Sequence, residues 1–383
     1  MIFRILEDQY AQKIRDSKAA DQRYMQLALS LGRRGQGRTW PNPAVGAVVV
    51  KDGVIVGRGW TQPGGRPHAE PEALRRAGEA ARGATLYVTL EPCSHFGKSP
   101  PCVEAVIAAG ISRVVSAIED PNPEVAGKGH AKLRSAGITV DVGLGAVEAA
   151  RDHAGHFLRI RDRRPHVILK LAVSADDKIG GSGRKPVAIT GEAARTQVHL
   201  LRAHNDAILV GIGTVLGDNP LLTCRLPGME ARSPVRVVLD RALRIPGDSR
   251  LVHSARATPL WVMTSETADA AAATKLGAAG AQVIRIPSDP AKSGLDLATV
   301  LNGLSEKGVS RLMVEGGARV ASSFVAAGLA DEIWLLRGPA TVGAEGVSAL
   351  GALPLAAITQ SPAFRVRASE TLDKDTLTIY ERA

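Results

Sequence analysis

The chain has 383 residues with 48 Lys and Arg against 38 Asp and Glu, a formal net charge of +10, and only 3% aromatic residues. This length exceeds one typical domain, and a composition rich in Ala, Gly and Val favours two α/β domains, each with its own core. Three cysteines imply no disulfide framework, and the charged start MIFRILEDQYAQKIRD offers no apolar run for a signal peptide or membrane span, so a cytoplasmic protein is expected.

The first half alternates helical and strand patterns. Residues 1–20 are expected to be a poorly ordered or peripheral N-terminal extension. From Asp21, RYMQLALSLGRRG has helical spacing and ends at Gly35. GAVVV and VIVGRGW predict two strands joined by a tight turn, and further strands and helices follow. Together these patterns predict an α/β/α layered domain over residues 21–164.

A histidine, a glutamate and two cysteines in this domain indicate a metal site. HAE places His68 two residues before Glu70, while EPC and PPC supply Cys93 and Cys102, which enclose eight residues. One imidazole and two thiolates suit Zn²⁺, and three protein ligands leave a fourth position for a water that ionises near neutral pH. Glu70 is expected to carry protons, as in zinc deaminases with the H-x-E and P-C signature. Cys102 follows Pro101 and is expected to open a helix, whose N-terminus favours a thiolate.

Two other interpretations of these residues stay open. They could be unrelated core or surface residues, although HAE, then PC, then a cysteine at a helix start disfavour a chance grouping. A closed structural zinc site would need a fourth protein ligand, and only His95 is near in sequence. Cys224 is left over and is expected to be a packed small side chain.

A second α/β domain is expected over residues 165–383. The strand HVILKLAVS opens it, the helix EAARTQVHLLRAH follows, and AILVGIGTVL, VRVVLD and LWVMTS are expected to be strands. RLMVEGGARVASS predicts a strand, two glycines and a helix, so that backbone N–H groups can approach a phosphate. VGIGT offers a second glycine turn. Each is by itself typical of a tight turn, but the two together favour a nucleotide cofactor crevice, and Arg202 and Arg225 flank the region with groups suited to a phosphate.

The motifs PNPAVGAVV, HAEPEAL, VTLEPCSHFGKSPPC, DPNPEVAGKG, LVGIGTVLGDNPLLTCR and VEGG follow one another in this order. With them the sequence closely resembles the bifunctional riboflavin-biosynthesis pyrimidine deaminase/reductase family. The resemblance covers nearly everything from residue 21, and the eight-residue loop and fused second domain separate this family from cytidine, guanine and tRNA-adenosine deaminases.

The resemblance implies a fold and an activity for each domain. The first would have the cytidine-deaminase-like fold and remove the exocyclic amine of 2,5-diamino-6-(5-phosphoribosylamino)pyrimidin-4(3H)-one. The second would have the dihydrofolate-reductase-like fold and use NADPH to reduce the ribose to a ribityl chain. The partners would be phosphorylated pyrimidines, with no nucleic acid or membrane, in a homodimer or larger assembly.

The resemblance also implies roles for individual residues. The zinc ligands would be His68, Cys93 and Cys102, with Glu70 as the proton shuttle. The base and ribose phosphate would contact Asn42, His95 and Lys98. The reductase substrate would contact Lys170, Arg202, Asp218, Asn219, Leu222, Arg225 and Glu315. NADPH would contact Ala172, Thr214, Asp218, Gly317, Ala318, Arg319, Val320, Ala321, Ser322 and Ser323.

This chain departs from the family pattern in both domains. Trp40 and Thr61 each stand where the family often has a histidine, so the deaminase is expected to hold its substrate differently. In the reductase, S-L-D-G is replaced by SADD at residues 174–177 and S-x-W-I-T by PVAIT at residues 186–190, which removes a tryptophan expected beside the cofactor.

Other functions stay open from the sequence. Positive charge and the H-x-E signature are compatible with a nucleic-acid (tRNA) deaminase, although no basic block is interleaved with aromatics. The altered 174–190 region is compatible with a zinc-stabilised nucleotide sensor whose reductase domain is inactive. NADH in place of NADPH is also open, since no cation for a 2′-phosphate can be singled out.

Overall fold

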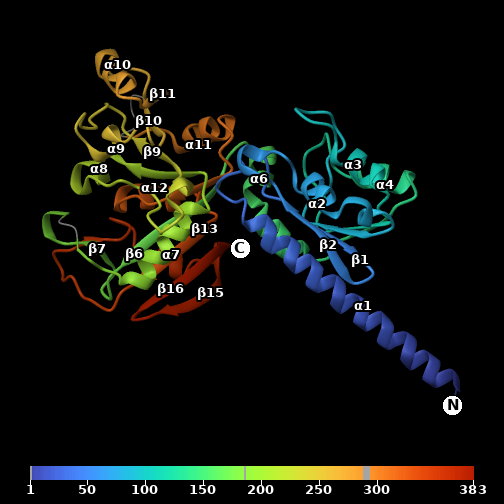
Figure 1. Ribbon diagram of the computed structural model, residues 1–383. Coiled ribbons are helices and arrows are strands. Elements are labelled where there is room, and N and C mark those ends of the chain that lie inside the picture. The colour runs from blue at the N-terminus through green and yellow to red at the C-terminus, as the bar shows by residue number, and fades with distance from the viewer. Residues whose placement is uncertain (1, 185–186, 288–293) are drawn as a thin grey trace. The chain divides into compact units, whose positions relative to one another are not determined.

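The structure is a computed structural model that describes residues 2–184, 187–287 and 294–383 (Figure 1). The chain divides into two compact units, Met1–Asp162 and Arg163–Ala383. Each unit has its own central sheet and its own buried apolar core. Pro186, the first residue of the altered PVAIT segment, lies outside the described residues.

The first unit is built on a five-stranded sheet with the order β2-β1-β3-β4-β5. β1 is antiparallel to β2 and to β3, whereas β3, β4 and β5 are parallel. The predicted hairpin turn is present, because Asp52 and Gly53 both have positive φ, 48° and 76°. The strands are β1 (Gly46–Lys51), β2 (Val54–Trp60), β3 (Thr85–Val88), β4 (Arg113–Ser116) and β5 (Thr139–Val142).

Helices cover both faces of this sheet, which confirms the predicted α/β/α arrangement. Successive strand side chains point to opposite faces, so Ala47 and Val49 pack with α2, α3 and α4, while Val48 and Val50 pack with α1 and α5. The helices are α1 (Ile2–Arg33), α2 (Ala69–Ala77), α3 (Cys102–Ala108), α4 (Lys128–Ser135), α5 (Ala146–Asp152) and α6 (Ala154–Arg161), with short 3₁₀ turns at Pro63–Gly65 and Gly78–Ala81.

The first helix begins earlier than the sequence predicted. α1 starts at Ile2 rather than near Asp21, so residues 2–20 are helical (Figure 1). This segment contains no Gly or Pro that would interrupt a helix. The prediction was wrong because it relied on apolar spacing, which marks only the part that packs on the sheet, from Met25 onward.

Helix α2, which carries Glu70 and begins directly after His68, packs very closely on β2. A β-carbon at Gly57 would lie 2.2 Å from the carbonyl oxygen of Ala73, and one at Gly59 would lie 2.2 Å from that of Ala69. Both distances are too short for any side chain. The alternation of glycines in VGRGW therefore lets the helix backbone rest directly on the strand, and this contact fixes where α2 begins.

Replacing Gly59 by alanine tests this packing. The added methyl group would collide with backbone rather than with a movable side chain, so Gly59→Ala is expected to lower the free energy of unfolding of the first unit by about 1–3 kcal/mol. Denaturant unfolding of the full chain measures this loss. Arg58→Ala is the matched control, because Arg58 lies between the two glycines with its side chain exposed. Equal stability of the two variants would contradict the proposed contact.

The second unit is built on a nine-stranded sheet with the order β11-β10-β9-β8-β12-β6-β13-β16-β15. The strands from β11 to β13 are parallel, and β16 and β15 complete the sheet in antiparallel fashion. The strands are β6 (His166–Val173), β8 (Ala207–Gly211), β9 (Val235–Leu239), β10 (Leu260–Ser265), β11 (Gln282–Ile286), β12 (Arg311–Val314), β13 (Glu332–Arg337), β15 (Phe364–Leu372) and β16 (Asp375–Arg382), while β7 (Lys178–Gly180) and β14 (Val347–Ser348) pair separately.

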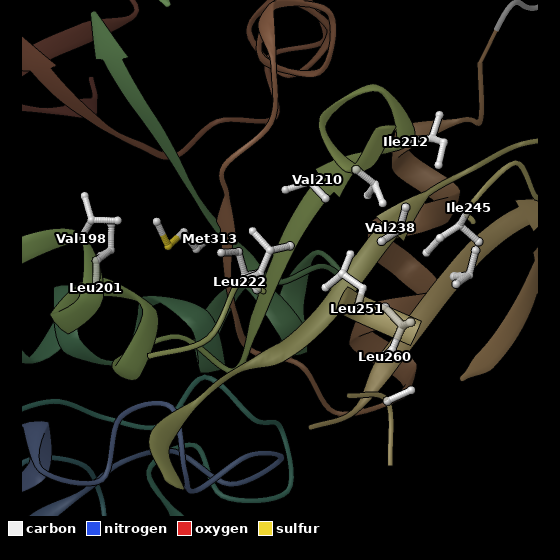
Figure 2. Close-up of a cluster of buried hydrophobic side chains, with 14 of the residues drawn as sticks. Val198, Leu201, Val210, Ile212, Leu222, Val238, Ile245, Leu251, Leu260 and Met313 are labelled. Atoms are coloured by element: carbon white, nitrogen blue, oxygen red, sulfur yellow. The ribbon is translucent and has the colours of Figure 1, made fainter. Parts of the chain in front are cut away.

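A buried apolar cluster joins the parallel strands of this unit to their helices. Figure 2 shows Val210 of β8, Val238 of β9 and Met313 of β12 among its side chains, with Val198 and Leu201 from α7. This packing gives a rigid base on which the strand ends present polar groups. The helices are α7 (Glu192–Ala203), α8 (Ile212–Asp218), α9 (Arg250–His253), α10 (Ala270–Ala278), α11 (Leu297–Glu306), α12 (Ala318–Ala326) and α13 (Ala356–Thr359), with 3₁₀ turns at Ser182–Arg184 and Glu230–Arg232.

The strand expected at AILVGIGTVL and strand β15 both differ from the sequence prediction. The expected strand AILVGIGTVL ends at Gly211, and α8 starts at Ile212, so the glycines mark the change from strand to helix. Strand β15 was not predicted, because FRVRASETL at the edge of the sheet alternates charged and apolar residues without a buried run.

Candidate active sites

The structure brings His68, Cys93 and Cys102 together. His68 precedes α2, Cys93 follows β3, and Cys102 is the first residue of α3. The Nδ1 atom of His68 lies 3.3 Å from the Cys102 sulfur and 3.8 Å from the Cys93 sulfur. A tetrahedral Zn²⁺ with bonds of about 2.0–2.3 Å separates its ligand atoms by about 3.3–3.8 Å, so the three side chains fit this ion.

Within the described part of the chain, no fourth protein ligand belongs to this group. Among the described residues, only His68, Cys93 and Cys102 have ligand atoms that all lie within 4.8 Å of one another here. His95, the side chain that could have closed the site, is exposed on the loop between the cysteines. The geometry therefore favours an open, catalytic type of zinc site over a closed structural one.

The two thiols differ in their readiness to ionise. A hydrogen bond with Cys102 lowers the pKa of Cys93 to about 4, and His68 acts in the same direction. The same hydrogen bond and burial raise the pKa of Cys102. The sequence predicted that the helix start would favour the Cys102 thiolate, but the Cys102 backbone N–H donates to the Cys93 sulfur, 3.3 Å away, and stabilises that thiolate instead.

Glu70 lies in the first turn of α2 with its side chain buried, 3% exposed. Burial raises the pKa of Glu70 to about 7, although the charge of His68 opposes this rise. Its carboxyl group also interacts with the Cys102 thiol. A carboxyl group enclosed beside three ligand atoms in this way can exchange a proton with whatever occupies the open position.

Glu91, which sequence reasoning did not single out, holds the loop before Cys93 in place. Its buried carboxylate accepts the backbone N–H groups of Asp120, Gly127 and His130 at 3.2, 3.0 and 3.1 Å. Glu91 and His130 also form part of a possible metal group with Glu119, but these hydrogen bonds already occupy the Glu91 carboxylate. The signal in the sequence was the pairing of LEPC with the glycine-rich GKG segment, whose backbone the carboxylate binds.

The predicted base and phosphate residues lie on two loops beside the zinc group. Asn42 donates from Nδ2 to the carbonyl oxygen of Gly65, 2.8 Å away, and so links the PNP loop to the turn before His68. His95 and Lys98 are exposed on the loop between the cysteines. Thr61, one of the departures from the family pattern, is buried, and its hydroxyl accepts the backbone N–H of Val45 at 3.0 Å.

In the second unit, Glu315 lies between two cations. Lys170 on β6 approaches one carboxylate oxygen at 3.2 Å, and Arg202 on α7 donates to the other from Nε at 3.1 Å and Nη2 at 2.8 Å. Burial alone would raise the pKa of Glu315, but Lys170 and Arg202 lower it to about 2. β6 and β12 are neighbouring parallel strands, which is why residues far apart in sequence meet here.

The two predicted glycine turns also meet at the carboxyl end of this sheet. β8 and β12 are adjacent and parallel, and they end at Gly211 and just before Glu315. A β-carbon at Gly317 would lie 3.7 Å from the Thr214 hydroxyl oxygen. Open α/β sheets bind nucleotides in crevices at the carboxyl ends of their strands, so this arrangement supports a nucleotide site.

Several other residues predicted to contact a ligand here have side chains or backbone groups that already bind elsewhere in the protein. Leu222 has its side chain in the apolar core (Figure 2), so only its backbone could face a ligand. The side-chain oxygen of Asn219 accepts the backbone N–H of Arg250 at 2.8 Å, and the backbone N–H of Arg225 donates to His199 at 3.3 Å. Ala321 is buried within α12, as its position after the first turn requires.

The remaining predicted residues of this unit lie near the strand ends. Ala172 follows Lys170 on β6 and packs partly on the apolar core. Asp218 is exposed at the end of α8, and partial loss of water around its carboxyl group raises its pKa. The other members of the Gly317 stretch form the first two turns of α12, where Ser322 and Ser323 donate to the Arg319 carbonyl; they are Ala318, Arg319, Val320, Ser322 and Ser323.

The altered SADD segment keeps an ordered turn after β6. Asp176 accepts from the Ser174 hydroxyl at 2.6 Å and from the backbone N–H groups of Val342 and Gly343 at 3.0 and 2.8 Å. Asp177, which replaces the family's glycine, has a φ of 63°, and its carboxylate lies 2.7 Å from Arg337. A positive φ is tolerated by aspartate, so the substitution keeps the turn.

Two different families match the two parts of the chain. Residues 18–118 match the family described as "Cytidine and deoxycytidylate deaminase zinc-binding region", and residues 165–378 match "RibD C-terminal domain". Fold and sites therefore define a two-domain enzyme with a zinc-binding deaminase region and a reductase domain that takes a nucleotide cofactor.

Relatives extend the likeness over more than nine tenths of the chain. A "Riboflavin biosynthesis protein RibD" from Aquifex aeolicus is 43% identical over 94% of this chain and 98% of its own length, and that from Escherichia coli is 40% identical over 91% and 95%. The chain belongs to the RibD family of riboflavin-biosynthesis deaminase/reductases.

Solved structures of relatives share the fold. The structure of Acinetobacter baumannii RibD, form 1, is 35% identical with a TM-score of 0.84, over 95% of this chain and 99% of that one. A Thermotoga maritima protein described as a diaminohydroxyphosphoribosylaminopyrimidine deaminase/5-amino-6-(5-phosphoribosylamino)uracil reductase is 35% identical with a TM-score of 0.83, with the same coverage.

Proposed function

We propose that this chain deaminates 2,5-diamino-6-(5-phosphoribosylamino)pyrimidin-4(3H)-one and then reduces the ribose of the product with NADPH. The observation that carries the proposal is the pairing of two sites in one chain. The His68, Cys93 and Cys102 group encloses a buried Glu70 in the first unit, and Lys170, Glu315 and Arg202 form a charged group beside glycine turns in the second.

In the deaminase, His68, Cys93 and Cys102 would hold Zn²⁺, which supplies an activated water at the open position. Glu70 then moves protons. Its buried carboxyl group accepts a proton from the attacking water and passes it to a ring nitrogen, then takes the second proton from the added hydroxyl group and delivers it to the amine, which leaves as ammonia while the hydroxyl oxygen becomes the carbonyl. The hydrogen bonds of Glu91 hold the loop before Cys93 in place relative to Glu70, so that the reacting carbon can meet both the activated water and the Glu70 carboxyl group.

In the reductase, NADPH would supply the hydride, and the chain's own task is to hold the sugar in line with it. Glu315 keeps Lys170 and Arg202 fixed at the end of β12. Lys170 donates a hydrogen bond to a sugar oxygen through a proton that the Glu315 contact leaves free. Thr214 and the start of α12 offer hydroxyl and backbone N–H donors to the cofactor phosphates.

Turnover of the purified protein tests both halves. We expect the diaminopyrimidine ribotide to give ammonia release and NADPH oxidation in the same sample, with NADPH preferred over NADH. Ammonia and absorbance at the nicotinamide band are followed together. Ammonia without NADPH oxidation would remove the reductase half of the proposal and locate the failure in residues 174–190, while no ammonia would remove the deaminase half.

Assembly and location stay predictions. None of the described helices is long and apolar enough to cross a membrane. A homodimer or larger assembly is expected, and sedimentation of the purified chain would measure it. A cytoplasmic location is expected from the small number of cysteines.

A further inference from the structure

Two loops beside the zinc group carry three basic residues, of which Arg66 and His95 lie on either side of Gly97. Arg66 lies two residues before His68, and its Nη1 donates to the Ser99 hydroxyl on the loop between the cysteines. A β-carbon at Gly97 would lie 3.5 Å from Nη2 of Arg66 and 3.9 Å from Nε2 of His95. The guanidinium and the imidazole therefore flank the bare backbone of Gly97, and Lys98 follows directly.

These basic groups have no acidic partner in the described part of the chain. No carboxylate lies within ion-pair distance of Arg66 or Lys98 there, and the only side chain that Arg66 binds is the neutral Ser99. Two other arginines of the first unit contrast with Arg66, since Arg33 pairs with Asp152 at 2.8 Å and Arg113 with Asp21 at 2.8 Å. Uncompensated positive charge next to a catalytic group attracts an anion.

We infer that Arg66 is a phosphate-binding residue of the deaminase and completes an anion site with His95 and Lys98. The inference deepens the proposed function and rests on it, since the anion is the 5-phosphate of the ribotide. Ser99 fixes one guanidinium nitrogen, which leaves the Nε and Nη2 edge to bind two phosphate oxygens in the fork geometry that arginine prefers. Gly97 presents no side chain that would fill the space between Arg66 and His95.

Steady-state ammonia release from the ribotide and from its dephosphorylated riboside tests this role. Arg66→Gln is expected to raise KM for the ribotide about tenfold or more, since it removes a charge-assisted pair of hydrogen bonds, and to leave kcat and the riboside KM nearly unchanged. Arg66→Lys keeps the positive charge but lacks the two-pronged guanidinium. Its KM for the ribotide is expected to lie between the values of the wild type and of Arg66→Gln.

Inhibition by free sugars gives a second readout. Ribose 5-phosphate is expected to inhibit ammonia release by the wild type more strongly than by Arg66→Gln, and ribose to inhibit both equally.

Arg58→Gln is the matched control, because Arg58 is exposed on β2 and loses the same charge. The zinc content of each variant shows whether the cysteine loop is intact. Equal KM increases for ribotide and riboside would overturn the inference and assign Arg66 to loop structure, as would an Arg66→Gln variant that behaves like Arg58→Gln. A wild-type chain that releases no ammonia from the ribotide would instead overturn the proposed function, and the inference with it.

Discussion

Glu70→Gln is expected to lower ammonia release by about 10²–10⁴-fold, the usual contribution of a positioned general acid and base. The amide has nearly the same shape as the carboxyl group but cannot accept and return a proton. Zinc content is expected to stay at the wild-type level, because Glu70 lies outside the three-residue ligand group. NADPH oxidation with the deaminated product supplied directly is also expected to be unchanged, since that site lies in the second unit.

Glu72→Gln is the matched control for Glu70. It lies on the same turn of α2, but its carboxylate pairs with Arg75 and Arg76 at the helix surface, at 3.1 and 3.4 Å. Surface pairs of this kind contribute little, so ammonia release is expected to be within about twofold of wild type. Deamination retained by Glu70→Gln would show that another group carries the protons and would refute the assigned role.

The deaminase site was predictable from sequence because its parts are local. His68 and Glu70 are separated by one residue at a helix start, and Cys93 and Cys102 bracket a single loop. Spacing alone therefore defines which atoms can meet. Spacing could not define the hydrogen bonds around these atoms. The hydrogen bond with Cys102 lowers the pKa of Cys93, and the Cys102 backbone N–H also donates to the Cys93 sulfur, whereas the sequence predicted a favoured thiolate only at Cys102.

The reductase site depends on the order of the strands in the sheet, which the sequence pattern does not indicate. The Lys170 and Glu315 side chains meet only because β6 and β12 are neighbours, and Arg202 reaches them from α7, which precedes β8. Resemblance to the family pointed to these residues, but not to their mutual contacts. The same limit applies to Arg66, because its link to Ser99 joins loops that no local pattern connects.

The reductase group makes its own stability depend on pH. The pKa of Glu315 is about 2 in the folded chain, below its ordinary value of 4.5, because Lys170 and Arg202 favour the carboxylate. A lowered folded pKa gives stability that is present above the ordinary value and is lost as the pH falls from about 4.5 to about 2. At neutral pH the group is therefore fully ionised, and Glu315 is expected to hold the two cations rather than to exchange protons.

Glu315→Gln is expected to lower the rate of NADPH oxidation by about 10²-fold or more, because removing one partner of a half-buried charge group leaves the other charges unpaired and free to move. Ammonia release is expected to remain at the wild-type level. The loss of stability between pH 4.5 and 2 is expected to become smaller, and thermal unfolding measured against pH tests this.

Glu332→Gln is the matched control, since Glu332 pairs with Arg367 at 3.1 Å at the start of β13, in the same sheet. If Glu332→Gln loses as much NADPH oxidation as Glu315→Gln, the loss reflects general destabilisation; if only Glu315→Gln loses it, the Lys170 and Arg202 group holds the substrate.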